Sequence, residues 1–283
     1  MRKVKVIADS TNDLSFEILQ QYDIDVVPLY VEFGEETYKD GVDIIPEQLF
    51  QLVSEKGILP KTAAPSPFDF ISVYTKYIEE GMDILVITLS AKMSSTYQNA
   101  VLAASEFPKG RIRVIDSQNL TTGIGSLVMI AREMAEKGIE IHSIAQELEA
   151  LVTKVKVSFV IDTLEYLYKG GRCNVIQNLL GTALKIRPII AVEDGRMIVE
   201  DKVRGDKKRA IEKLLEKLFK NPQSIYQNRI IIPYSLGSEE DAELMKSMIQ
   251  KELPGTEILI TKAGCVISSH CGMKTLGLSY IQK

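Results

Sequence analysis

The chain of 283 residues has few of the side chains on which metal and redox sites depend. It contains three cysteines, two histidines and no tryptophan. Cys173, Cys265 and Cys271 show no paired C-x-x-C spacing, so we expect reduced thiols and neither a disulfide framework nor a zinc site. With His142 and His270 as the only histidines, a histidine-rich metal centre is excluded. We therefore expect no bound metal.

The sequence also lacks an excess of positive charge. Its formal net charge is −4, and no basic tail is present, which argues against a general nucleic-acid or anionic-membrane binder. No apolar run approaches the roughly 18 residues that a membrane-spanning helix needs. The first residues, MRKVKVIADS, reach Asp9 before the apolar core of a signal peptide could form. We expect a cytoplasmic protein with no nucleic-acid partner.

What the sequence does contain is a regular alternation of strands and helices. Strands are predicted at 3–8, 84–88 and 111–116, with helices over 123–137 and 141–152, which favours a mainly parallel α/β sheet covered on both faces. After residue 155 the rhythm changes, and Asp194-Gly195 between two apolar runs indicates a hairpin. The length favours two domains. We predict an α/β lobe over 1–155 and an α+β lobe over 156–283.

Three stretches are less regular, and each has a simple interpretation. Residues 26–33 read as one strand, and 61–67 as a loop that two prolines stiffen. Residues 264–272 are small and polar and read as a loop between two strands. A helix is expected to begin at Asn174.

The stretch from Ile84 to Asn99 is the most informative for function. A short buried strand runs into Ser94, Ser95 and Thr96, which stand where a helix should begin. Such a helix end has unpaired backbone N–H groups and the positive pole of the helix dipole, so it can hold a carboxylate or a phosphate. The alternative is that Ser94 or Ser95 only caps the helix.

Polar residues at the ends of other strands could lie near Ser94. Thr62 precedes the central strand by one helix, and in a doubly wound sheet it could reach the same edge. Asp9 and Ser10 follow the first strand, and Asp116 and Ser117 follow a later one. They could orient the hydroxyl groups of the site, or they could serve only as turns and caps.

Two further residues and one basic cluster could carry chemistry. Arg172 follows two glycines, so its guanidinium is presented from a turn and could bind an anion. His270 could donate to a carboxylate or relay a proton, or it could be a structural residue. Arg204, Lys207, Lys208 and Arg209 lie at a helix start, against the helix dipole, so they could face a partner or simply be solvated.

Two enzyme classes lose support because their motifs are missing. No glycine-rich dinucleotide fingerprint follows a strand, and no G-x-x-x-x-G-K-[ST] occurs, so no nucleotide cofactor is expected. A serine hydrolase would need a G-x-S-x-G nucleophile elbow, which is also absent.

Taken together, six motifs in order resemble the DegV family of bacterial fatty-acid-binding proteins, whose members include the fatty-acid-carrying subunit of fatty acid kinase. The resemblance covers nearly the whole chain. It rests on Asp9-Ser10-x-x-Asp13, Thr62-Ala63-Ala64-Pro65-Ser66, Leu89-Ser90-x-x-x-Ser94-x-Thr96-Tyr97, Val114-Ile115-Asp116-Ser117, Leu164-Glu165-Tyr166-Leu167-x-Lys169-Gly170-Gly171-Arg172 and Ser268-x-His270-x-Gly272.

The resemblance implies a two-domain protein that encloses one long-chain fatty acid, with the carboxyl group held where the lobes meet. The ligand-binding positions of the family fall on Thr62, Ser94, Arg172 and His270, with Ser95 beside them, and the acyl chain would occupy a tunnel in the N-terminal lobe. A separate ATP-dependent kinase would phosphorylate the bound acid to an acyl phosphate. This chain would be the carrier, not the catalyst, and transient contact with a membrane surface would allow ligand exchange.

The resemblance has two departures and leaves two other functions open. The family commonly has glycine at position 95, and Gly-Pro-Gly where this chain has Gly272-Met273-Lys274. The basic residues Arg204, Lys207 and Lys208 are assigned to kinase docking. The alternatives are an enzyme acting on an acyl or phosphoryl substrate with His270 as acid and base, and a sensory or structural α/β module with another small anionic ligand.

Overall fold

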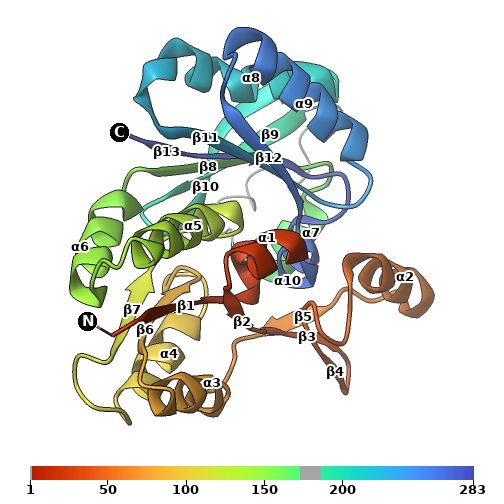
Figure 1. The fold of residues 1–283 in the computed structure, drawn as a ribbon. Helices are drawn as coiled ribbons and strands as arrows, with labels where there is room; N and C mark the ends of the chain where they lie inside the picture. Colours follow the sequence, from red (N-terminus) through yellow and green to blue (C-terminus); the bar gives the residue numbers. More distant parts are fainter. Residues whose placement is uncertain (1, 173–185) are drawn as a thin grey trace.

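The computed structural model describes residues 2–172 and 186–283, and a four-stranded parallel sheet is the centre of its N-terminal half (Figure 1). The strand order is β2-β1-β6-β7, so the chain winds outward in both directions from β1 and β6. The strands are β1 (Val4–Asp9), β2 (Asp25–Val27), β6 (Asp83–Thr88) and β7 (Ile112–Asp116). This arrangement confirms the predicted doubly wound α/β sheet.

Helices cover both faces of this sheet. Their apolar stripes face the strands, and Phe70 and Tyr74 of α3 are completely buried. On one face lie α3 (Pro67–Glu79) and α4 (Thr96–Ala104), and on the other lie α5 (Thr122–Glu136) and α6 (Ile141–Val152).

A six-stranded mixed sheet organises the C-terminal half, in the order β10-β9-β8-β13-β11-β12. The pair β11 and β12 is parallel and the other pairs are antiparallel, which confirms the predicted change of rhythm and the hairpin at Asp194-Gly195. The strands are β8 (Val155–Val160), β9 (Ile186–Glu193), β10 (Arg196–Arg204), β11 (Ile225–Tyr234), β12 (Glu257–Lys262) and β13 (Leu276–Gln282). The helices α8 (Lys207–Lys220) and α9 (Glu239–Glu252) cover its outer face (Figure 1).

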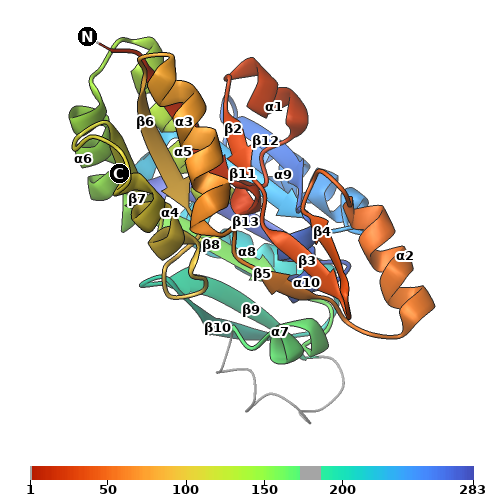
Figure 2. The same ribbon diagram turned by 90° about the horizontal axis from the view of Figure 1, so that it is seen from below.

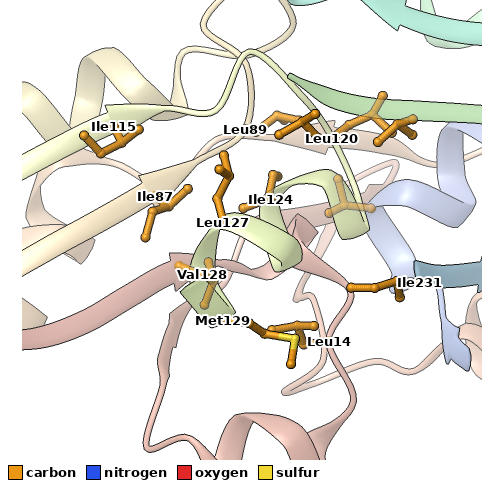
Figure 3. Close-up of a cluster of buried hydrophobic side chains, with 14 of the residues drawn as sticks. Leu14, Ile87, Leu89, Ile115, Leu120, Ile124, Leu127, Val128, Met129 and Ile231 are labelled. Atoms are coloured by element: carbon orange, nitrogen blue, oxygen red, sulfur yellow. The ribbon is translucent and has the colours of Figure 1, made fainter. Parts of the chain in front are cut away.

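Helix α5 lies between the two sheets. It packs on β1 and β6 of the parallel sheet and on β8, β11 and β13 of the mixed sheet (Figures 1 and 2). Its first ten residues, Thr122 to Ala131, are all buried, because apolar and small side chains surround the whole helix rather than one stripe. Figure 3 shows Ile124, Leu127 and Val128 of α5 among side chains of the parallel sheet, with Ile231 of the mixed sheet beside them.

A small antiparallel sheet lies beside the parallel one and corrects two of the expectations. Its order is β4-β3-β5. The run 26–33 is therefore not one strand: it divides at Pro28 into β2 and a strand of the small sheet. Thr62, which was expected in a loop, lies in β5. The strands are β3 (Tyr30–Phe33), β4 (Glu36–Lys39) and β5 (Lys61–Ala63).

Helix α10 is a third correction. Residues 264–272 were expected to form a loop, but Cys265–Cys271 form a helix with His270 in its last turn. The predicted helix that begins at Asn174, together with Cys173, lies outside the described residues. The other short elements are η1 (Ser10–Asn12), α1 (Phe16–Gln21), α2 (Pro46–Lys56), α7 (Glu165–Gly170) and η3 (Pro222–Ser224).

Two further observations concern the whole of the described chain. Cys265 and Cys271 are buried free thiols. Within residues 2–172 and 186–283, none of the helices combines the length and the apolar character that crossing a membrane would require.

Candidate functional site

A cavity of about 310 Å³ lies where the three sheets and α10 approach one another. It is lined by Thr62, Ser94, Ser95, Arg172 and His270, so the structure brings together all five residues that the sequence assigned to ligand binding. The rest of the lining is mainly apolar and comes from both halves of the chain. Apolar and sulfur-containing side chains in the lining are Leu29, Leu89, Met93, Leu120, Val157, Phe159, Leu167, Met197, Pro233, Val266, Ile267 and Cys271.

This lining differs from the expected position of the acyl chain. The family resemblance implied a tunnel in the N-terminal lobe, whereas the apolar wall of this cavity also includes Val157 and Phe159 of β8 and Met197 of β10. The difference arises because the strands of the mixed sheet face α5 and the loops of the parallel sheet. Such packing across a large sequence separation cannot be read from local periodicity.

Thr62 and His270 form a hydrogen-bonded pair at the cavity wall. Thr62 Oγ1 lies 2.8 Å from Nε2 of His270. Burial lowers the pKa of His270 to about 4, and the nearby charge of Arg172 adds to this shift, so the ring is neutral near pH 7. Among the described residues, Nδ1 of His270 is buried and has no hydrogen-bond partner.

The unpartnered Nδ1 indicates which nitrogen carries the proton. A buried N–H without an acceptor is rarer in proteins than an unused acceptor, so we assign the proton to Nε2. Nε2–H then donates to Thr62 Oγ1, and the hydroxyl hydrogen of Thr62 is left to donate elsewhere. Because Thr62 lines the cavity, the pair presents a donor to a ligand oxygen.

Arg172 and Gly170 complete this side of the cavity. Arg172 is exposed, and its Nη1 donates to the carbonyl oxygen of Gly170 at 2.8 Å. Gly171 ends α7 with φ 66°, a left-handed conformation that glycine adopts without strain. Gly170 lies so close to His270 that a Cβ at this position would overlap Nδ1 of the ring. The Gly-Gly pair therefore both turns the chain and makes room for His270.

Ser94 and Ser95 stand at the start of α4, as the sequence predicted. Ser95 occupies the N-cap position but makes no side-chain capping bond. Ser94 Oγ lies 2.8 Å from Thr96 Oγ1 and accepts a long bond of 3.3 Å from the backbone N–H of Thr96. The side chain of Ser94 therefore caps α4 only through one long bond, and the side chain of Ser95 does not cap the helix.

Asp9, Asp116 and Ser117 hold the loops at the carboxyl edge of the parallel sheet. Asp9 is fully buried and accepts from Thr11 and, at 2.6 Å, from the backbone N–H of Leu89. Burial raises the pKa of Asp9 to about 6. Asp116 Oδ1 accepts from the backbone of Ala91 at 3.1 Å, so two carboxyl groups fix the loop that leads to Ser94. The hydroxyl of Ser117 bonds only the backbone of Asn119.

Ser10 connects this edge to a carboxyl group that the sequence did not single out. Ser10 Oγ donates to Asp40 Oδ2 at 2.9 Å, and Asp40 Oδ1 accepts from the backbone N–H of Cys265 at 2.8 Å. Burial raises the pKa of Asp40. Asp40 lies just before a turn and has no sequence signal of function, so only the fold shows that it contacts α10.

Asp13 and Thr121 are two more residues of this region that sequence reasoning did not assign to the site. Asp13 accepts from Thr121 Oγ1 at 2.6 Å and from the backbone N–H of Gly264 at 2.8 Å. Burial raises the pKa of Asp13 to about 8. Thr121 lines the cavity with φ 47°, a conformation that is rare for a β-branched residue. The signal that could have found Asp13 was its place in the Asp9-Ser10-x-x-Asp13 motif.

The basic residues proposed for docking lie at the end of β10 (Arg204) and at the start of α8 (Lys207 and Lys208), and they are not equivalent. Arg204 and Lys208 are exposed. Lys207 is only 15% exposed, and its Nζ lies 2.6 Å from a carboxylate oxygen of Asp241 and 2.7 Å from Ser238 Oγ. Lys207 is therefore engaged within the chain, and its assignment to docking stays a prediction.

The two departures from the family pattern have different structural consequences. Ser95 has φ −78°, which any residue adopts, so glycine is not required there. Lys274 has φ 58°, a left-handed conformation that favours glycine. Its carbonyl oxygen accepts from Lys207 Nζ at 2.8 Å. Where the family commonly has glycine, Lys274 adopts this conformation, and its contact with α8 holds the loop after His270.

A family model and curated relatives match nearly the entire chain. The model described as an uncharacterised protein of the DegV family matches residues 3–283. A DegV domain-containing protein of Clostridium perfringens is 35% identical over the full length of both chains. A protein of Thermotoga maritima described as a fatty acid-binding protein is 37% identical, covering 97% of this chain and 96% of the relative.

Solved structures have the same fold. A DegV family protein from Thermus thermophilus, described as binding fatty acid, has a TM-score of 0.90 and is 35% identical, covering 99% of this chain and 100% of that one. A stearic acid-binding protein from Eubacterium ventriosum has a TM-score of 0.87 and is 27% identical, covering 100% of this chain and 99% of that one.

Proposed function

The chain belongs to the DegV family, and from this we propose that it binds one long-chain fatty acid and presents the carboxyl group to a separate fatty acid kinase. The observation that carries the proposal is a mainly apolar cavity in which Thr62, Ser94, Arg172 and His270 gather. Relatives described as fatty-acid-binding proteins support the same ligand class.

The polar residues of the cavity suit a carboxylate. In our assignment the hydroxyl hydrogen of Thr62 is free to donate to the ligand, because Thr62 Oγ1 is the acceptor in its bond with His270. Arg172 contributes a positive charge, and the start of α4 contributes the positive pole of a helix dipole. An ionised carboxylate accepts hydrogen bonds and donates none, so these donors match it.

The apolar wall would supply most of the affinity. At roughly 0.8 kcal/mol per buried methylene, a chain of about fourteen methylenes offers on the order of 11 kcal/mol before the costs of association. Donors at the headgroup offset the desolvation of the carboxylate and fix which end of the acid faces solvent. Arg172 and Ser95 are exposed, so the carboxyl end is the end that a second protein could reach.

We propose that this chain is a carrier and that the chemical step belongs to the kinase. His270 is the alternative acid and base, but a pKa near 4 makes it a weak base at neutral pH. Its ring is also hydrogen-bonded to Thr62.

The proposal is tested by identifying the ligand and by removing the headgroup donors. Extraction of the purified protein and mass spectrometry should yield a long-chain fatty acid. Thr62→Ala and Ser94→Ala should each weaken binding of palmitate about tenfold, by roughly 1.4 kcal/mol, which is the size of a hydrogen bond to a charged group. Ser72→Ala is the control, because the Ser72 hydroxyl bonds only Phe68 O on the outer face of α3.

Two results would contradict this function. A protein that carries no acid and binds none when palmitate is added would not be a fatty-acid carrier. Release of a product from an acyl substrate without any kinase, lost in His270→Ala, would instead support the enzyme alternative.

A further inference from the structure

We propose that Asp13 is a positioning residue for the ligand site: it joins helix α10 to the cavity wall at Thr121 and thereby holds His270 against Thr62. This inference rests on the proposed function, because it assigns a role to a residue that lines no part of the cavity and acts through residues that do. Four observations lead to it.

The first observation is the position of Asp13 between two parts of the chain that are distant in sequence. One carboxyl oxygen of Asp13 accepts from Thr121, which is 108 residues away, and the other accepts from Gly264, which is 251 residues away. Thr121 is the N-cap of α5, and Gly264 is the N-cap of α10. A single buried side chain thus connects the starts of both helices.

The second observation is that α10 has little to stabilise it locally. It is a helix of seven residues, and its N-cap is Gly264, which has no side chain to cap the backbone. Helices this short are unstable without tertiary contacts. The first free N–H groups are instead satisfied by Asp13 at Gly264 and by Asp40 at Cys265. The direction of α10 is therefore set by carboxyl groups of the N-terminal half.

The third observation is the tight space around the end of α10. His270 lies in the last turn, with Nε2 on Thr62 and Nδ1 against Gly170. A tilt of the helix would move the ring off the Thr62 hydroxyl on one side or against the backbone of Gly170 on the other. Loss of the bond at the beginning of α10 should therefore loosen His270 at its end.

The fourth observation is the backbone of Thr121. A threonine with φ 47° and ψ −139° is strained, and such conformations persist only where the surroundings enforce them. The hydroxyl of Thr121 donates to Asp13, and Thr121 lines the cavity. Asp13 therefore holds a strained part of the wall as well as the helix opposite it.

The decisive experiment follows the ring of His270 by NMR during a pH titration of the full chain without ligand. The chain has two histidines, and His142 is exposed on α6, so its resonance is an internal reference. In the wild type His270 should titrate near pH 4. In Asp13→Asn, an amide nitrogen replaces one acceptor oxygen, and the titration of His270 should move up toward the ordinary value of 6.5 as water reaches the ring.

Asp9→Asn is the matched control for this titration. Asp9 is a buried carboxyl group of the same motif, but its partners are Thr11 and Leu89, neither of which lies in α10. The same change at Asp9 should leave the titration of His270 where it is in the wild type. A titration of His270 that is unchanged in Asp13→Asn, or that moves equally in Asp9→Asn, would overturn the inference.

Palmitate binding is the second measurement, and we expect Asp13→Asn to weaken it about tenfold. An unchanged affinity together with a moved titration would overturn the connection between Asp13 and the ligand. If the wild type itself binds no fatty acid, the proposed function fails, while the titration still decides whether Asp13 positions His270.

A second pair of variants keeps the test decisive if Asp13→Asn does not fold. Thr121→Val removes the hydroxyl and keeps the shape of the side chain, whereas Thr121→Ser keeps the hydroxyl. We expect Thr121→Val to lower palmitate affinity and to shift His270, and Thr121→Ser to behave as the wild type. Equal behaviour of the two variants would contradict the role of the bond to Asp13.

Discussion

Gly170 shows how a single missing side chain can matter at the residue scale. Glycine is usually unfavourable within a helix, and Ala would gain about 0.5–1 kcal/mol of helix stability there. At Gly170 the expected sign is reversed, because a Cβ would overlap Nδ1 of His270. Glycine is needed at this position because the ring of His270 occupies the space that a Cβ would take.

We therefore expect Gly170→Ala to weaken palmitate binding about tenfold or more, by displacing His270 from Thr62. The measurement is a titration of palmitate binding together with thermal unfolding. The control is Ser268→Ala, in the same helix as His270, because the Ser268 hydroxyl bonds the backbone of Ala263 at a long distance of 3.3 Å and lines no part of the cavity. Wild-type affinity in Gly170→Ala would show that the ring has room to move.

Lys207 and Lys208 are neighbours at the element scale that should respond differently to substitution. Lys207→Ala removes the ion pair to Asp241 and the bonds to Ser238 and Lys274. The expected cost is about 1–3 kcal/mol of unfolding free energy, measured by chemical denaturation. Lys208 is exposed in the first turn of α8, where its positive charge opposes the helix dipole, so Lys208→Glu should not lower stability and should raise it by about 0.3–1 kcal/mol.

The docking prediction is then best tested with Arg204→Glu and Lys208→Glu together, without changing Lys207. Palmitate affinity should remain that of the wild type, and the rate of acyl phosphate formation with a purified fatty acid kinase and ATP should fall several-fold. The rate should also become less sensitive to salt, because the attraction between the proteins is electrostatic. An unchanged rate would remove this surface from the docking site.

The elements that the sequence predicted well are those with a strong local pattern. α6 has the predicted bounds, and β1, β6 and β7 were found within one residue at each end, because buried strands and amphipathic helices have characteristic periods. The five residues assigned to the site were chosen as polar residues in expected loops, a glycine turn and a helix start, together with the family resemblance. The structure places all five around one cavity, and their role in ligand binding stays a prediction.

The elements that were missed depend on contacts that are distant in sequence. β4 is mostly exposed and carries charged residues, so it has no apolar period. α10 is rich in small residues and resembles a loop until Asp13 and Asp40 satisfy its first N–H groups. The cavity wall from β8 and β10 was missed for the same reason. Asp13 and Thr121 acquire their roles only in the folded chain.

The buried carboxyl groups affect the stability of the whole molecule as the pH changes. The pKa of Asp13 rises from 3.8 to about 8 on folding and that of Asp9 to about 6, so the folded state binds more protons than the unfolded state above about pH 4. Their contribution to stability therefore falls as the pH rises through this range. His270 acts in the opposite direction, since its pKa falls from 6.5 to about 4, and its contribution is lost below pH 6.5.

Between pH 6.5 and pH 8 the effect of Asp13 should thus prevail. We expect the free energy of unfolding to fall across this interval in the wild type, and to fall less steeply in Asp13→Asn, which has no carboxyl group to titrate. Urea denaturation at several pH values measures both slopes. Parallel slopes for the two proteins would mean that Asp13 is ionised in the folded chain at neutral pH.

Helix α5 has a consequence for how an occupant can leave the molecule. Helix α5 packs on the parallel sheet with one side and on the mixed sheet with the other. Separating the two halves would therefore expose one side of α5 and a large apolar area to water. Separating the two halves is therefore a costly way to release a ligand. Small, local openings around the rim, where Arg172 and Ser95 are exposed, would uncover less apolar area.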